Sequence, residues 1–379
     1  MTLRQIRAVA VLVITVAFIA ACSGAGGPYE PNAIVGEISL RGAVTLAADE
    51  SAECLDVFGD RALLSVNRRF TPDEPEFREE GYNAETVLVM VYNHAAGIVE
   101  KTADIGRLRY VASGALSGRG FAFTTVVWQS QEASERGAVT VELYGGGERH
   151  ISVDVGMYAT TGYGDPRIVR LGDGYAFTYC EDMGMGEFGV KTLSSEGEIE
   201  TALALETPDG HFLSNDILSD GGGFVYFAEV NERGTLFLGG NGPIRSFSLA
   251  ADERMNAYAL TAESVFLSIE RVDDENAHIS YEIAFVDFNG RRTARDVGVN
   301  AYYKRILTGG WGNGVVAQYH TGEVHVIWSD GGAVKTKTVD MPPNPAALFT
   351  ADASVVYAYY PAGAGDAGTL SRIENSPVR

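Results

Sequence analysis

The chain has 379 residues and a formal net charge of −21, because 50 Asp and Glu residues outnumber 29 Lys and Arg residues. Nucleic acid and anionic lipid head groups repel so acidic a chain, and it has no basic patch. The composition therefore argues against a nucleic-acid partner. It leaves three explanations for the charge, namely solubility, positively charged partners or metal cations.

The first 22 residues have the features of an export signal. Arg4 and Arg7 precede an apolar run, Ala8 to Ala20, that only Thr15 interrupts. The run is too short to span a bilayer, and it ends in small residues, as a cleaved signal peptide does. The tetrapeptide that follows, Ile19-Ala20-Ala21-Cys22, resembles the lipobox of bacterial lipoprotein precursors. This resemblance implies cleavage before Cys22 and a covalent lipid (palmitate or a similar acyl chain) on that cysteine. An ordinary secretory signal with a chance cysteine is the alternative.

The resemblance divides the chain into three parts. We expect a signal peptide over 1–21, a flexible tether over 22–33 and a folded domain over 34–379. The tether is small, Gly- and Pro-bearing, and reaches at most about 40 Å when extended. The expected location is the extracytoplasmic face of the cell membrane or, since Ser23 permits such sorting in lipoproteins of double-membraned bacteria, the outer membrane.

The folded domain carries a repeated strand pattern. A short apolar strand, a small turn and a second apolar, aromatic-rich strand recur seven times, at intervals of roughly 40–60 residues. The second strands are expected to begin near Ala62, Phe121, Tyr175, Phe224, Val265, Val315 and Val355. Most of them precede two further strand-like runs. Short helical candidates occur only around 48–54 and 250–255.

Four strands per unit at this period predict an all-β, seven-bladed β-propeller, in which radial stacking buries both faces of each sheet. The last unit has room for only three strands, and the run Ile34–Leu40 can supply the fourth. The ring would then be closed by its N-terminal strand and would have no open edge. The repeats carry no signature of a named propeller family. A pair of β-sandwiches or a β-helix is the alternative.

Two cysteines remain in the folded domain, Cys54 and Cys180. An exported protein can form a disulfide. The repeat pattern places the two cysteines two blades apart, which favours buried, unpaired thiols.

The loops from second to third strands are acidic, and the loops between blades add aromatic residues. In a propeller both kinds of loop lie on one face, so the pattern predicts a binding rim for a sugar, a cation or a basic peptide. The candidate rim residues are Glu79, Tyr158, Tyr163, Asp165, His211, Asp273, Asp274, Tyr302 and Tyr303. The longest acidic loop, 67–84, has no apolar pattern, and its charge density favours disorder.

The sequence lacks the common catalytic, phosphate-binding and metal-binding motifs, so no catalytic residue, metal ligand or cofactor is predicted besides the lipid on Cys22. His320 and His325 flank a Thr-Gly turn, where cross-strand pairing explains them better than a metal. The sequence favours a lipid-anchored envelope module that binds or scaffolds a protein or glycan. The alternatives are a carbohydrate-active enzyme with carboxylates around a central pocket, and a purely structural role.

Overall fold

The computed structural model describes residues 32–74, 84–128, 136–145, 150–159, 166–182, 186–207, 216–230, 233–240, 242–261, 263–273, 277–298, 302–306, 314–330, 332–352, 355–362 and 367–376. The signal peptide and nearly all of the tether lie outside these ranges. Within them, no helix has the length and apolarity needed to cross a membrane.

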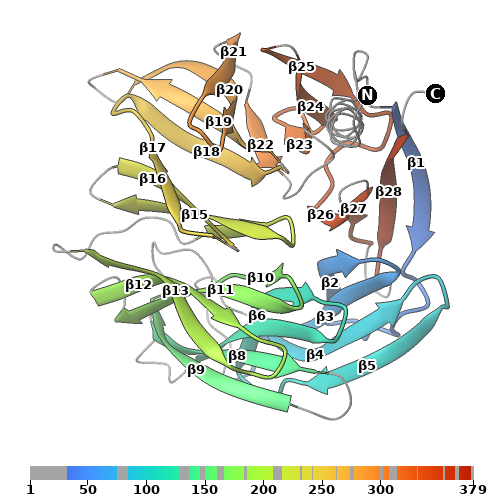
Figure 1. Cartoon of the computed structure of the whole chain (residues 1–379). Coiled ribbons are helices and arrows are strands. Elements are labelled where there is room, and N and C mark those ends of the chain that lie inside the picture. Colours follow the sequence, from blue (N-terminus) through green and yellow to red (C-terminus); the bar gives the residue numbers. More distant parts are fainter. Residues whose placement is uncertain are drawn as a thin grey trace, which may run out of the picture.

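The described residues form 28 strands, which build seven four-stranded antiparallel blades around a central axis (Figure 1). Blade 1 comprises β2 (Glu50–Phe58), β3 (Arg61–Arg69), β4 (Ala84–Asn93) and β5 (Ile98–Asp104). Blade 2 comprises β6 (Arg109–Leu116), β7 (Phe121–Trp128), β8 (Arg136–Tyr144) and β9 (His150–Ala159). Blade 3 comprises β10 (Ile168–Leu171), β11 (Gly174–Asp182), β12 (Gly186–Leu193) and β13 (Ile199–Thr207).

Blade 4 comprises β14 (Asp216–Ser219), β15 (Gly223–Val230), β16 (Arg233–Gly240) and β17 (Arg245–Ser248). Blade 5 comprises β18 (Glu253–Leu260), β19 (Ser264–Val272), β20 (His278–Asp287) and β21 (Arg292–Gly298). Blade 6 comprises β22 (Tyr303–Ile306), β23 (Gly314–Tyr319), β24 (Val324–Asp330) and β25 (Ala333–Thr338). Blade 7 comprises β26 (Ala347–Asp352), β27 (Val355–Tyr360), β28 (Thr369–Ser376) and β1 (Asn32–Ser39). The seven-bladed propeller predicted from the sequence is therefore confirmed.

Burial follows the position of a strand within its blade. The second strand lies between the neighbouring sheets on both faces, and β19 and β27 are accordingly buried along almost their whole length. Outer strands such as β5 and β25 are mostly exposed. A strand buried on both faces reads as a continuous apolar run, and this run is the signal that the sequence repeats.

The core consists of seven apolar clusters, one at each seam between neighbouring blades. Tyrosine hydroxyls reinforce three of these seams with hydrogen bonds. Tyr175 bonds Ser117 between blades 3 and 2, Tyr258 donates to the Asp216 carbonyl between blades 5 and 4, and Tyr359 donates to the Ala52 carbonyl between blades 7 and 1. Each blade is thus held mainly by its two neighbours.

The N-terminal strand closes the ring. β1 pairs antiparallel with β28 over eight residue pairs, from Asn32 with Ser376 to Ser39 with Thr369, and forms the outer edge of blade 7 (Figure 1). The cluster at the closing seam, between blades 7 and 1, is the largest of the seven, with 15 buried residues. The strand predicted over Ile34–Leu40 is confirmed, and it begins two residues earlier than expected.

The two short helical candidates, 48–54 and 250–255, form no helix. The pentapeptide Leu-Ala-Ala-Asp-Glu, at 46–50 and 249–253, overlaps the start of each candidate and forms the turn that leads into a first strand, β2 or β18. The carboxylate of Glu50 accepts the Ala47 N–H at 2.8 Å, and that of Glu253 accepts the Ala250 N–H at 3.0 Å. Side-chain capping of this kind stabilises a turn without a helix behind it.

Cys54 and Cys180 are buried and are not joined in a disulfide, as predicted. Cys54 lies in the cluster between blades 7 and 1, whereas Cys180 lies in the cluster between blades 3 and 4. A disulfide cannot join two different seams without moving the backbone.

Loss of β1 should open the ring. A chain that begins at Arg41 leaves the edge of β28 unpaired and uncovers Leu370, so its melting temperature should fall by at least about 10 °C relative to a chain that begins at Glu30. Adding a synthetic peptide of residues 30–40 should restore stability through strand addition, and a scrambled peptide should not. Equal melting temperatures for the two chains would contradict the closure.

Candidate functional site

A cavity of about 650 Å³ runs through the centre of the ring. Its wall comes from six first strands, β2, β6, β10, β14, β18 and β26, and contains many small residues such as Ala112, Gly114 and Ala257. Five acidic or basic residues are placed among them, namely Glu53, Asp56, Arg167, Arg170 and Asp216. The described wall at the centre of the propeller therefore encloses a polar cavity and is not closed by packed side chains.

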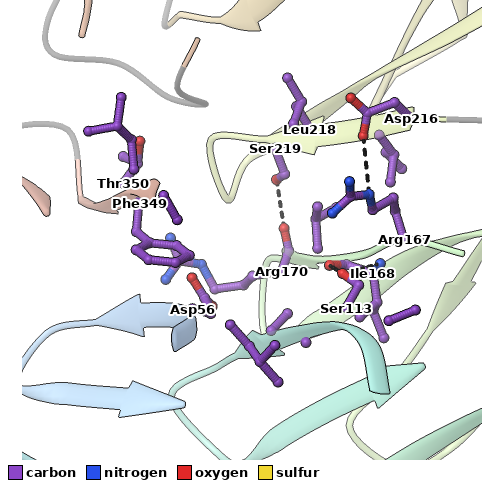
Figure 2. Close-up of a pocket in the computed structure, with 18 of the residues that line it drawn as sticks. Asp56, Ser113, Arg167, Ile168, Arg170, Asp216, Leu218, Ser219, Phe349 and Thr350 are labelled. Carbon is purple, nitrogen blue, oxygen red and sulfur yellow. Dashed lines mark hydrogen bonds and ion pairs between the residues drawn. The ribbon is translucent and has the colours of Figure 1, made fainter. Parts of the chain in front are cut away.

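Arg170 reaches across this channel from β10 toward β2 and β26. Figure 2 shows its guanidinium beside Asp56 and Phe349, and its carbon Cζ lies 4.0 Å from the centre of the Phe58 ring. The Asp56 carboxylate accepts the N–H of Val57 at 2.8 Å and that of Leu116 at 2.7 Å. Burial raises the pKa of Asp56 to about 6, although the Leu116 N–H and the Arg170 charge both oppose the rise.

A second charged pair lies further along the same wall. The guanidinium Nε of Arg167 is 3.7 Å from the carboxylate of Asp216, and the two side chains remain 49% and 43% exposed to the channel (Figure 2). Burial raises the pKa of Asp216, and the nearby Arg167 charge opposes the rise. Since water reaches both groups, this pair contributes little to stability.

Two serines join the first strands around the channel. Ser113 of β6 accepts the Ile168 N–H at 3.1 Å, and Ser219 of β14 donates to the Arg170 carbonyl at 2.6 Å (Figure 2). The channel thus has opposite charges that lie close to each other, and its wall is held together by serine hydrogen bonds between first strands. This arrangement can hold a small polar ligand, whereas nothing in it aligns a nucleophile with a base.

The predicted binding rim corresponds to one face of the ring. We call it the rim face, formed by the loops between second and third strands and the loops between blades; the opposite face is the hairpin face. Glu79, Tyr163, Asp165, His211 and Asp274 lie outside the described residues, as does Cys22, and Tyr158 is described only through its backbone in β9.

Three predicted rim residues are described in full. The carboxylate of Asp273 accepts the Ala277 N–H at 2.8 Å and so braces the loop between β19 and β20. Tyr302 is half-buried on the rim face, whereas Tyr303 is only 2% exposed and donates or accepts a hydrogen bond at 3.1 Å with Nδ1 of His325. The structure thus brings Tyr302 and Tyr303 to the same seam, with opposite exposure, because successive side chains point in opposite directions.

Tyr302 belongs to a row of five contacting rings that crosses the seam between blades 5 and 6. We call this row the aromatic ladder. Its successive centroid distances are 4.2 Å for His278–Tyr281, 5.2 Å for Tyr281–Tyr302, 5.3 Å for Tyr302–His320 and 4.3 Å for His320–Tyr319. Tyr319 continues the contacts into the core, where it stacks on His325 at 4.9 Å.

The turn that carries His320 is fixed from the connection between blades 6 and 7. Gly322 has a φ of +101°, and a Cβ there would lie 2.3 Å from the side-chain oxygen of Asn344. Asn344 in turn donates its N–H to the Gly322 carbonyl at 2.8 Å. Only glycine fits this turn, and His320 is thereby held against Tyr302 rather than against His325. The cross-strand pairing expected for the two histidines is wrong, because His325 pairs with Ala317.

Sequence reasoning missed Tyr281 and Tyr319 as rim residues, and it placed no site on His278 or His320. No local spacing reveals them, since the five rings come from two blades and meet only when the seam forms. Within the described residues, no group of three or more His, Cys, Asp or Glu side chains is arranged to hold a metal ion.

No protein-family model and no curated protein matches the chain. Among solved structures it is similar to the β-propeller domain of the Trilobed protease from Pyrococcus furiosus, reported to have an open velcro topology, with a TM-score of 0.53, 10% identity, and coverage of 88% of this chain and 96% of that one. It also aligns with a chain of the Mitotic Checkpoint Complex, with a TM-score of 0.48, 10% identity, and coverage of 92% of this chain and 96% of that one. A chain of Kuenenia stuttgartiensis hydrazine synthase aligns with a TM-score of 0.48, 9% identity, and coverage of 82% of this chain and 100% of that one. The first similarity supports the propeller fold and nothing beyond it.

The two channel arginines should act on different carboxylates. Replacing Arg170 by Met removes the charge that opposes the raised pKa of Asp56, so that pKa should rise above 6 in a ¹³C NMR titration, while Arg167→Met should leave it unchanged and raise the pKa of Asp216 instead. Because the folded pKa of Asp56 exceeds its ordinary value of 3.8, the stability that this group contributes is present below about pH 4 and lost as the pH rises through 6. An Asp56 pKa near 4 in the wild-type chain would refute this description of the channel.

Proposed function

We propose that this chain is a lipid-anchored module on the extracytoplasmic face of the cell envelope, which binds or scaffolds a protein or glycan partner through the rim face. The anchor is the lipid on Cys22, and the membrane is one partner through it. The propeller fold supports a binding or scaffolding role, because a rigid ring holds loops from several blades in fixed relative positions.

One observation carries the binding part of the proposal. The aromatic ladder leaves the rings of Tyr281, Tyr302, Tyr319 and His320 partly exposed side by side on the rim face. Exposed apolar area of this kind has a cost in water, and aromatic side chains are enriched where proteins bind partners. The channel charges, in contrast, are matched by neighbours within the ring.

A carbohydrate-active enzyme is the second candidate, and one observation favours it. Asp56 has a pKa near 6 and lines a polar cavity, as a general acid in a glycosidase does.

The anchor has a direct test. Cys22→Ala should abolish metabolic labelling with a palmitate analogue and release the chain from the membrane fraction, because no other residue is proposed to carry lipid. Cys54→Ala is the matched control, since that thiol is buried in a seam and should not affect labelling. Labelling that persists in Cys22→Ala would show that the signal belongs to another class of exported protein.

The binding and catalytic roles separate in a second experiment. Charge reversal at Glu79, Asp273 and Asp274 should weaken the capture of envelope partners on immobilised protein, with Asp56→Asn unchanged. Turnover of any member of a glycan panel by the wild-type chain, lost in Asp56→Asn, would support the enzyme instead. Capture that is unchanged by the charge reversal would contradict a role for the rim loops.

A further inference from the structure

The aromatic ladder lies between two carboxylates. At its blade 5 end, the side chain of Glu270 is 3.0 Å from Nδ1 of His278, and in the strand register Glu270 lies directly opposite Tyr281. At its blade 6 end, the carboxylate of Glu323 is 3.6 Å from Nε2 of His325, which stacks on Tyr319. The Glu323 side chain is 56% exposed, so its charge is open to solvent.

Two of the arginines of blade 5 point away from these two carboxylates. Arg271 and Arg292 face the opposite side of the blade, where they form an ion-pair network with Asp252, Glu253 and Glu282. Adjacent positions such as Tyr281 and Glu282 point to opposite faces of a strand. The side toward blade 6 combines exposed ring faces with these carboxylates. It also carries Arg254, which lies opposite Glu270 in the strand register and whose guanidinium donates to the Ala251 and Glu253 carbonyls.

Polar atoms of three ladder residues, Tyr281, Tyr302 and His320, are also available. Among the described residues, the hydroxyls of Tyr281 and Tyr302 and the imidazole nitrogens of His320 make no side-chain hydrogen bond, and these side chains contact one another through their ring faces. Buried packing tyrosines elsewhere in the ring, such as Tyr258 and Tyr359, use their hydroxyls. The ladder thus differs from the tyrosines that only hold blades together.

We propose that the aromatic ladder, with Glu270 and Glu323, binds an arginine- or lysine-bearing segment of a partner protein. The inference rests on the proposed function as a binding module and specifies its partner. A guanidinium stacks on aromatic faces by cation–π attraction and forms two parallel hydrogen bonds to a carboxylate, so rings between two carboxylates match alternating basic side chains. The net charge of −21 attracts such a segment over long range.

The charges favour this partner over a neutral glycan. A sugar can also stack on tyrosine rings, but a neutral sugar gains no charge attraction from the two carboxylates. A basic segment uses both features, and its affinity must therefore fall with salt as well as with loss of the rings.

The test uses the full chain, purified from membranes, and a fluorescent (Gly-Arg)4 peptide as the probe. The wild-type chain should bind this peptide and neither (Gly-Gln)4 nor a neutral oligosaccharide, and the affinity should fall between 50 and 300 mM salt. Tyr302→Ala and the pair Glu270→Gln/Glu323→Gln should each weaken binding at least about tenfold, while Tyr302→Phe should bind like the wild type because it keeps the ring.

The matched control is Glu37→Gln/Glu200→Gln, which changes the net charge equally on the exposed outer strands β1 and β13. It should bind within about twofold of the wild type. Equal weakening by both pairs would show that the peptide follows net charge alone and would overturn the inference, as would unchanged binding by a folded Tyr302→Ala. Binding of the oligosaccharide instead, sensitive to Tyr302→Ala, would overturn it in favour of a glycan. These outcomes leave the lipid anchor, tested through Cys22, unaffected.

Discussion

Pairing of β1 with β28 is the contact on which the rest of the ring depends. Each blade buries its faces only against its neighbours, so seven apolar clusters exist only while the ring stays closed. The closing seam joins residues from the two ends of the sequence and carries the largest of these clusters. The chain has to be synthesised almost completely before this seam can form, and the ring is then stabilised as a unit.

Closure also determines which side chains can serve function. Around the channel, opposite charges from neighbouring first strands compensate each other, as with Arg167 and Asp216. On the rim face, the seam between blades 5 and 6 brings Tyr281 against Tyr302 and leaves their rings partly open. The stacking of blades that buries the apolar faces therefore also pairs opposite charges around the channel and leaves aromatic rings exposed on the rim face.

The sequence predicts this fold well where a strand is buried on both sides. The second strands begin within one residue of the expected positions. A continuous apolar run can be recognised in the sequence without knowing which strands pack beside it. The segments around Glu50 and Glu253 are helical candidates in the sequence because alanine and glutamate favour helices locally, whereas the structure forms a capped turn at each. The sequence does not show that Tyr302 is partly exposed and Tyr303 buried, nor that His278 and His320 lie in the same row of rings as Tyr302. Both features arise only when blades 5 and 6 pack against each other, and no local sequence pattern encodes that contact.

The direction of β1 determines from which face of the ring the preceding chain leaves. Ser39 lies at the rim face, where the chain passes to β2, and antiparallel pairing with β28 therefore places Asn32 at the hairpin face. A lipid on Cys22 would join the ring through Asn32, on the side opposite the aromatic ladder. In an anchored molecule the point of attachment and the ladder would then lie on opposite faces, so that the tether would not cover the surface that carries the ladder.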